Sequence, residues 1–186
     1  KHILEQQATT AHNLANATTT GFKAQVDSFR AVPVLGDGLP TRAFVVDATV
    51  GTDYKSGAIQ QTGRDLDVAV TGEGWIAVQR ADGSEGYTRN GALKINENGQ
   101  LQTSTGLNVM GDGGPISIPP DSAIAIGKDG TISTVSNLTT PSPSTIIGRI
   151  KLTNPPPASM KRADDGVFVT ANGQAAPADA NVTVAG

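Results

Sequence analysis

The chain has 186 residues, of which 37% are hydrophobic and 17% charged, with a net charge of -3 at pH 7 and no cysteine. This length allows one substantial domain with its own hydrophobic core. The acidic balance and the lack of any basic cluster argue against nucleic acid as a partner, because phosphate binding needs a concentrated positive surface. The lack of cysteine excludes disulfides, thiolate catalysis and cysteine-ligated metals.

The start of the chain shows neither a membrane span nor a secretion signal. No stretch approaches ~18 consecutive apolar residues, and residues 1–7 carry Glu5 and two glutamines where a signal peptide would be apolar. We therefore expect no membrane insertion and no cleaved signal peptide. Because the chain begins at Lys1 with no capping residue before the apolar pattern, we also expect a fragment that enters its first helix part-way.

The first predicted element is a helix over residues 1–16, which Thr18 to Gly21 bring to an end. Its apolar stripe follows helical spacing and consists of Leu4, Ala8, Ala11 and Ala15, with Ile3 and Leu14 beside them. Isolated helices below ~12–15 residues are marginal in water. The stripe therefore predicts that the helix packs on a partner surface.

Two composition changes divide the rest of the chain. Residues 21–40 contain Pro33, Gly36, Gly38 and Pro40, which predicts an extended connector. From Thr41 onward the pattern changes to short alternating runs broken by turn dipeptides. We therefore divide the chain into a remnant of an N-terminal assembly helix (residues 1–20), a connector (21–40) and a β-rich body (41–186).

Alternation with a period of two predicts strands in the body. Residues 65–70 and 93–95 each place apolar side chains on one face, as in half-buried antiparallel strands. Asp82-Gly83, Asn90-Gly91 and Asn98-Gly99 recur at an even spacing and predict tight hairpins. Further strands are predicted at residues 75–79, 116–118, 123–126, 132–135, 146–152, 167–170 and 182–184. The predicted fold is mainly β, with an antiparallel meander body forming a sandwich or a partly open barrel.

The sequence motifs for nucleotide or metal binding are weak. Gly72, Gly74 and Ala77 match the spacing of a dinucleotide-binding loop, but such a loop must open a helix, and residues 75–79 are predicted to form a strand. His2 and His12 are too far apart to bind one metal from a helix face. We therefore predict no cofactor and no metal ligand.

Asp65 and Asp67 provide the only candidate for catalysis. On one strand face they would lie about 7 Å apart, inside the ~6.5–9.5 Å separation of inverting glycosidases. A cell-wall glycan-binding or glycan-hydrolysing module is therefore an alternative. Exposed carboxylates on a strand more often serve solubility and edge protection, and nothing nearby predicts a desolvating pocket that would raise one pKa. We predict no catalytic residue and no enzyme.

Two segments resemble the flagellar rod and hook protein family. Residues 13–23, NLANATTTGFK, are similar to the N-terminal signature of that family. Residues 65–109, with DLDVAVTGEGW, YTRNG and GQLQTSTG, are similar to its first body strands. Residues 30–34, RAVPV, and the pair Gly74-Trp75 resemble the proximal rod members more than the distal ones.

The resemblance implies a structural subunit of the proximal rod that transmits motor torque to the hook, with the distal rod as an alternative. It further implies export through the flagellar type III apparatus to the periplasmic rod, other rod proteins and further copies of the chain as partners, and no cofactor. The expected assembly residues are Leu4, Ala8, Ala11, Asn13, Leu14, Ala15, Asn16, Thr20, Gly21, Phe22 and Lys23.

Overall fold

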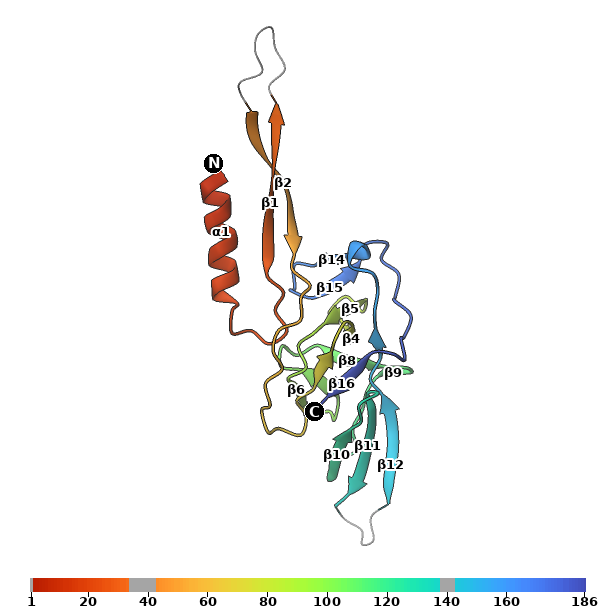
Figure 1. The fold of residues 1–186 in the computed structure, drawn as a ribbon. Helices are drawn as coiled ribbons and strands as arrows, with labels where there is room; N and C mark the ends of the chain where they lie inside the picture. Colours follow the sequence, from red (N-terminus) through yellow and green to blue (C-terminus); the bar gives the residue numbers. More distant parts are fainter. Residues whose placement is uncertain (1, 34–42, 138–142) are drawn as a thin grey trace. The chain divides into compact units, whose positions relative to one another are not determined.

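A computed structural model describes residues 2–33, 43–137 and 143–186 (Figure 1). The chain divides into two compact units, Lys1–Lys55 and Ser56–Gly186. Within the described ranges the fold is mainly β, every strand pairing is antiparallel, and one α-helix is present at the N-terminal end. The predicted fold class is confirmed, and the strands described do not close into a barrel.

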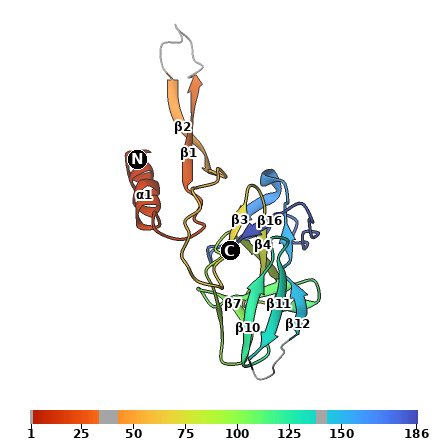
Figure 2. The same cartoon turned by 60° about the horizontal axis from the view of Figure 1, so that its bottom comes forward.

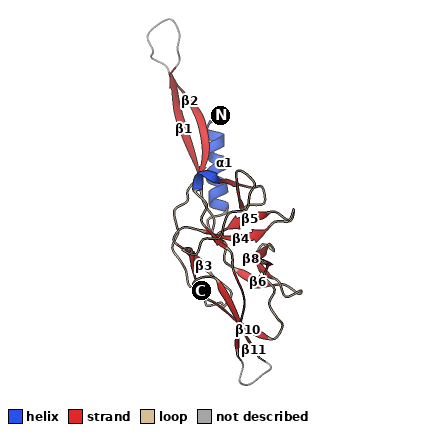
Figure 3. Ribbon diagram, turned by 90° about the vertical axis from the view of Figure 1, so that its right-hand side faces the viewer, coloured by secondary structure: helices blue, strands red, loops and turns tan. Residues whose placement is uncertain are grey.

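The first unit consists of one helix and one long β-hairpin (Figure 3). Helix α1 spans His2–Ala15, in agreement with the prediction. Strand β1 (Gln25–Pro33) pairs with β2 (Ala43–Thr52), and a register shift after Ser28 places one extra residue in β2. The predicted connector therefore contains a strand that the sequence pattern did not indicate. The expected start of the body at Thr41 lies outside the described residues.

The second unit is built on a nine-stranded sheet. Its main path runs through β14 (Met160–Arg162), β15 (Phe168–Thr170), β5 (Glu85–Thr88), β4 (Trp75–Gln79), β8 (Asn108–Gly111), β7 (Leu101–Thr103) and β6 (Leu93–Ile95). Off this path, β13 (Leu152–Thr153) pairs with β4, and β9 (Gly114–Pro115) pairs with β8. A 3-10 turn, η1 (Pro157–Ser159), precedes β14.

Two smaller sheets complete the second unit. Strands β3 (Ala69–Thr71) and β16 (Thr183–Ala185) form a pair. Strands β10 (Ser122–Ile126), β11 (Thr131–Ser136) and β12 (Ser144–Arg149) form a three-stranded sheet, which is seen side by side in Figure 2. One hydrophobic cluster joins all three sheets through buried side chains. They include Ile76 and Val109 of the large sheet, Ile132 of the three-stranded sheet, and Val70 and Val184 of the β3–β16 pair.

Most of the predicted strands are present, and the differences have local causes. Residues 65–70 do not form one strand, because the Asp67 N–H donates to the Arg64 carbonyl (3.1 Å) and closes a turn. Residues 116–118 contribute only an isolated bridge between Gln100 and Ser117. The predicted strand 146–152 is two strands, β12 and β13, on different sheets.

The evenly spaced turn signals do not produce an uninterrupted meander. Gly83 (φ 82°) and Gly99 (φ 77°) adopt the left-handed backbone of tight turns, as predicted. The predicted hairpin turn at Asn90-Gly91 is wrong, because β5 and β6 are not neighbours and β4, β8 and β7 lie between them.

Gly91 instead occupies a point where two backbones nearly touch. The Val68 N–H donates to the Gly91 carbonyl at 2.9 Å. A Cβ added to Gly91 would lie 1.6 Å from the Val68 carbonyl oxygen, well inside van der Waals contact. Only glycine fits at this crossing of the core.

We therefore expect Gly91→Ala to lower the free energy of unfolding by ~3 kcal/mol or more, because the backbone of Val68 has to move. Gly148→Ala is the matched control, since a Cβ at Gly148 meets nothing within 4 Å. Urea unfolding monitored by tryptophan fluorescence measures both variants. Equal midpoints for the two would show that the crossing is not tightly packed.

A polar network around the buried Tyr87 connects β5 to the C-terminal part of the unit. Lys151 Nζ donates to both carboxylate oxygens of Glu85 at 2.7 and 2.8 Å. The Tyr87 hydroxyl donates to Glu85 Oε1 at 2.8 Å and accepts a hydrogen bond from the Ala176 N–H at 2.6 Å. Burial raises the pKa of Tyr87 to about 12, because the phenolate would be poorly solvated beside a carboxylate.

This shift predicts alkaline destabilisation. An unfolded tyrosine ionises near pH ~10, so the contribution of Tyr87 is complete below that pH and is lost as the pH rises to about 12. A shift of this size corresponds to roughly 2–3 kcal/mol. Urea unfolding across this pH range should show a steep loss of stability that is reduced in Tyr87→Phe and retained in Tyr54→Phe. An unchanged slope in Tyr87→Phe would contradict the assignment.

Candidate assembly surface on the N-terminal helix

Helix α1 contacts the hairpin of its own unit through polar side chains. The Asn13 amide Nδ2 donates to the Gln25 carbonyl at 2.8 Å, and the Gln25 N–H donates to Asn13 Oδ1 at 2.9 Å. One turn earlier, Thr9 Oγ1 donates to Asp27 Oδ1 at 2.9 Å. The side chains of Thr9 and Asn13 therefore define the hairpin-facing side of the helix, because residues four apart lie on one face.

The apolar residues of α1 lie on the opposite side. Ile3 and Leu4 are each 70% exposed and Leu14 is 75% exposed, and the alanines Ala8, Ala11 and Ala15 are exposed as well. Helices of soluble proteins normally bury their apolar stripe and expose their polar one. The arrangement is reversed here, so the stripe predicted from the sequence is presented to solvent within the described structure.

The turn after α1 is held by its own hydrogen bonds. Asn16 Nδ2 donates to the His12 carbonyl at 2.9 Å, and the ring of Phe22 lies 5.6 Å from that of His12. Thr20 and Gly21 are exposed, and Gly21 takes a left-handed backbone (φ 73°). Asn16 and Phe22 thus have local structural contacts in addition to the predicted role in assembly.

Lys23 is the one buried residue among the predicted assembly positions. Its side chain is directed at the segment that follows β2, where Nζ donates to the carbonyls of Tyr54 (3.0 Å) and Lys55 (2.6 Å). These bonds join the two ends of the hairpin segment. An ammonium group is costly to bury without acceptors, so this contact supports a structural role for Lys23.

The predicted assembly residues therefore fall into two groups. Asn13, Asn16, Phe22 and Lys23 shape the unit internally, whereas the apolar residues of α1 are accessible. Sequence reasoning missed the positioning role of Thr9, although its spacing from Asn13 placed both on one helix face. That the accessible residues contact other subunits stays a prediction.

The two aspartates considered for catalysis do not form a pair on a strand face. Asp65 is exposed in the turn, and Asp67 accepts a hydrogen bond from Arg64 Nη2 at 2.5 Å. Burial alone would raise the pKa of Asp67, but hydrogen bonds from Arg64 and Thr62 outweigh it and hold the pKa below its usual value. A general acid of a glycosidase needs a raised pKa. Asp67 does not supply one.

The glycine motif at residues 72–77 lies at the start of a strand. Gly72 (φ 74°) and Gly74 (φ 127°) form the turn between β3 and β4, so the dinucleotide-like spacing opens a strand, as predicted. In the parts of the chain that the structure describes, no group of three histidine, aspartate or glutamate side chains could hold a metal ion. Among the same residues, no helix is long and apolar enough to cross a membrane.

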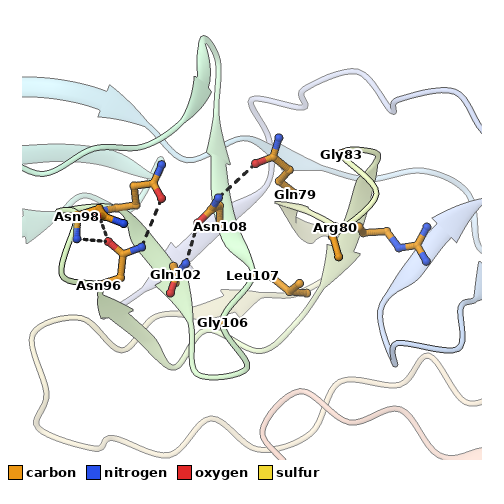
Figure 4. A pocket seen from close by; sticks show the side chains of 11 residues that line it. Gln79, Arg80, Gly83, Asn96, Asn98, Gln102, Gly106, Leu107 and Asn108 are labelled. Carbon is orange, nitrogen blue, oxygen red and sulfur yellow. Dashed lines mark hydrogen bonds between the residues drawn. The ribbon is translucent and has the colours of Figure 1, made fainter.

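A hollow lined largely by side-chain amides lies beside strands β4, β7 and β8 (Figure 4). Gln102 Nε2 donates to Asn108 Oδ1 at 2.9 Å, and Asn108 Nδ2 donates to Gln79 Oε1 at 3.2 Å. These side chains come from the adjacent strands β7, β8 and β4 and occupy opposed register positions. Such cross-strand pairs stabilise a sheet. The hollow is therefore accounted for by sheet structure, and sequence reasoning did not identify it.

Comparison with known proteins defines the class first. The family model described as "Flagellar hook protein FlgE/F/G D1 domain" matches residues 69–134, from the start of β3 into β11. The matched region thus contains most of the large sheet. Over these residues the body is similar to the D1 domain of flagellar hook proteins that the model describes.

Individual relatives give a narrower assignment. The chain is 48% identical to the flagellar basal-body rod protein FlgF of Escherichia coli (strain K12), over 89% of this chain and 65% of the relative. It is 49% identical to FlgF of Salmonella typhimurium, over 92% of this chain and 68% of the relative. The chain belongs to the FlgF family of flagellar basal-body rod proteins. It spans about two thirds of the length of these relatives.

The FlgG proteins, which represent the distal rod alternative, are less similar to this chain. The rod protein FlgG of Agrobacterium fabrum is 30% identical over 90% of this chain, and FlgG of Buchnera aphidicola is 32% identical over 77% of it. The identity to the two FlgF relatives is higher by about 16–19 percentage points, taking 48–49% against 30–32%. The preference for the proximal rod members is confirmed.

We expect Asn13→Ala to loosen α1 from the hairpin, because it removes both hydrogen bonds to Gln25 and leaves backbone groups to be solvated. The cost should be ~1–3 kcal/mol of local stability. Hydrogen exchange of the α1 and β1 amides measures it. Asn13→Asp, which keeps only the acceptor, should lie in between, and Gln7→Ala on the exposed side should leave exchange unchanged. Equal exchange in all three variants would exclude this docking contact.

Proposed function

We propose that this chain is a structural subunit of the bacterial flagellar basal-body rod, of the proximal rod type, and that it assembles with other rod proteins and with copies of itself. The drive shaft built in this way passes motor torque to the hook. The observation that carries the proposal is the 48–49% identity to two FlgF proteins over 89–92% of this chain. Because the chain covers about two thirds of those relatives, the role of the whole subunit is inferred from them.

The outward apolar face of α1 supports an assembly role. Burying a leucine or isoleucine side chain contributes roughly 1.5–3 kcal/mol. Ile3, Leu4 and Leu14 are exposed by 70–75%, so covering them in a contact would contribute several kcal/mol. A helix of 14 residues also gains little stability on its own. Contact with neighbouring subunits would supply the missing burial.

The proposal includes a location and a route. The subunit would lie in the periplasmic part of the basal body and reach it through the flagellar type III export apparatus without a cleaved signal peptide. A chain with no cysteine forms no disulfides that would have to be reduced before passage as an unfolded polypeptide. In this role the protein performs no catalysis and needs no cofactor.

A glycan-directed module is the second candidate, and it is less well supported. It depended on Asp65 and Asp67 as a carboxylate pair. The turn at Asp65 and the lowered pKa of Asp67 remove the geometry and the acidity that the reaction requires.

A chimera tests the proposed function directly. The aligned region of Escherichia coli FlgF would be replaced by this chain in cells that lack their own FlgF. We expect the chimera to restore swimming. Leu14→Asp in the chimera should abolish it, because a carboxylate on the apolar face of α1 cannot be buried without a large cost.

Thr18→Asp is the matched control, since it adds the same charge at an exposed position after the helix and should leave motility intact. Swimming in soft agar and electron microscopy of isolated basal bodies provide the readouts. A chimera that is exported and stable but builds no rod would overturn the proposal.

A further inference from the structure

Three Asn-Gly dipeptides occur in the chain, at Asn90-Gly91, Asn98-Gly99 and Asn172-Gly173. An asparagine before a glycine can lose its side-chain amide spontaneously, because the glycine nitrogen attacks the side-chain carbonyl carbon and no Cβ on the glycine hinders it. Asparagine is accordingly among the thermolabile residues of proteins. Since the reacting dipeptide is the same at all three sites, their relative rates depend on how firmly the fold holds each one.

The reaction consumes only water. The glycine nitrogen gives its proton to solvent and forms a bond to the asparagine Cγ. The bond between Cγ and Nδ2 breaks, and the amide leaves as ammonia after it takes a proton from solvent. Water then opens the resulting ring at either of its carbonyls, which gives aspartate or isoaspartate, and no group is oxidised or reduced. A side chain therefore reacts only if its Cγ can turn toward the following nitrogen.

The Asn90 side chain is held at both ends. Its Nδ2 donates to Ser104 Oγ at 3.0 Å, and its Oδ1 accepts a hydrogen bond from the Ala92 N–H at 3.1 Å. The following Gly91 is buried, and its backbone lies against that of Val68. Ring closure at this site requires both side-chain bonds to break and the crossing with Val68 to open.

The two exposed asparagines differ in one hydrogen bond. Asn172 Oδ1 accepts from the Gln174 N–H at 3.1 Å, which fixes the orientation of its carboxamide. Asn98 lies in the turn after β6 (Figure 4), where its backbone N–H donates to Asn96 Oδ1 at 3.0 Å. The Asn98 carboxamide makes no hydrogen bond to any residue that the structure describes. This side chain is therefore free to rotate toward the Gly99 nitrogen.

The attacking nitrogens do not separate these two exposed sites. The Gly99 N–H donates to the Asn96 carbonyl at 3.0 Å, and the Gly173 N–H donates to the Thr170 carbonyl at 3.1 Å. Both glycines adopt a left-handed backbone, with φ of 77° and 71°. The two turns thus offer the same kind of nucleophile, and the freedom of the asparagine side chain is what distinguishes them.

We propose that Asn98 is the preferred site of spontaneous deamidation in the folded chain and that it converts to aspartate and isoaspartate. Each hydrogen bond that must break before ring closure slows the reaction by about two- to tenfold. Asn172, held by one such bond, should react more slowly than Asn98 by this factor. Asn90, with two bonds and a packed backbone, should react slowest of the three.

The product changes a turn that contacts the rest of the second unit. The Ile118 N–H donates to the Gly99 carbonyl at 2.7 Å, and a Cβ on Gly99 would lie 2.9 Å from the Ile118 carbonyl oxygen. Isoaspartate adds a methylene group to the main chain just before this contact. Either product also adds a carboxylate next to Glu97, and like charges repel. Deamidation should therefore weaken the contact between the turn and residues 116–118.

Peptide mapping tests the order of the three sites. The purified 186-residue chain would be incubated in mildly alkaline buffer, digested at intervals and analysed by mass spectrometry, which measures the converted fraction at each asparagine. A parallel incubation in guanidinium chloride removes the fold. We expect Asn98 to react fastest in buffer, and we expect the three rates to approach one another in the denaturant.

Two outcomes would overturn the proposal. Equal or faster conversion of Asn172 or Asn90 in the folded chain would show that side-chain freedom does not set the order. An equal lead of Asn98 in the denaturant would show that the neighbouring sequence, rather than the fold, sets it.

Matched variants locate the damage. Asn98→Gln lengthens the side chain and disfavours closure of the small ring, and Asn172→Gln makes the same change at the other exposed site. After incubation, the urea midpoint should fall in the unaltered chain and in Asn172→Gln, whereas Asn98→Gln should keep its initial midpoint. An equal fall in Asn98→Gln would place the damage at another site and contradict the proposal.

Discussion

The two hydrogen bonds between the Asn13 carboxamide and the backbone of Gln25 fix the rotation of α1 about its own axis. A carboxamide carries a donor and an acceptor in the same arrangement as a peptide group. Asn13 can therefore pair with the start of β1 much as an adjoining strand would. Thr9 donates a hydrogen bond to Asp27 one turn away, so the polar side of the helix faces the hairpin. The outward direction of the apolar stripe follows from this constraint.

In this orientation the apolar side chains of α1 stay accessible to solvent instead of stabilising their own unit. Its apolar side chains contribute little to the folding of their own unit, because most of their surface stays in water. The second unit contains the hydrophobic cluster that joins its sheets, and no residue of the helix belongs to that cluster. Lys23 closes the base of the hairpin with bonds to two carbonyls. This division lets the N-terminal unit present its surface while the body supplies a stable fold.

Sequence periodicity predicted much of this fold and failed where long-range contacts decide. The helix over residues 1–16 and the strand at residues 75–79 were predicted correctly, since each side-chain pattern matches one local period. The strand order was not predictable in the same way. Strand β8 follows β7 through a tight turn, but its pairing with β4 on its other side joins residues about 30 positions apart, and no turn sets that contact. Gly91 resembled a turn glycine, and only its distance to Val68 shows why it is required.

The same distinction between local pattern and long-range contact applies to the candidate assembly surface on α1. By itself the sequence determined which residues of the helix are apolar, that the chain carries the signature of an axial flagellar family, and that turns with a left-handed glycine occur at Gly83 and Gly99. These properties depend on local spacing and residue type. The tertiary structure alone decided that the apolar stripe points away from its own hairpin and that Lys23 is buried. Both depend on hydrogen bonds between residues 12 to 32 positions apart, which no local pattern encodes.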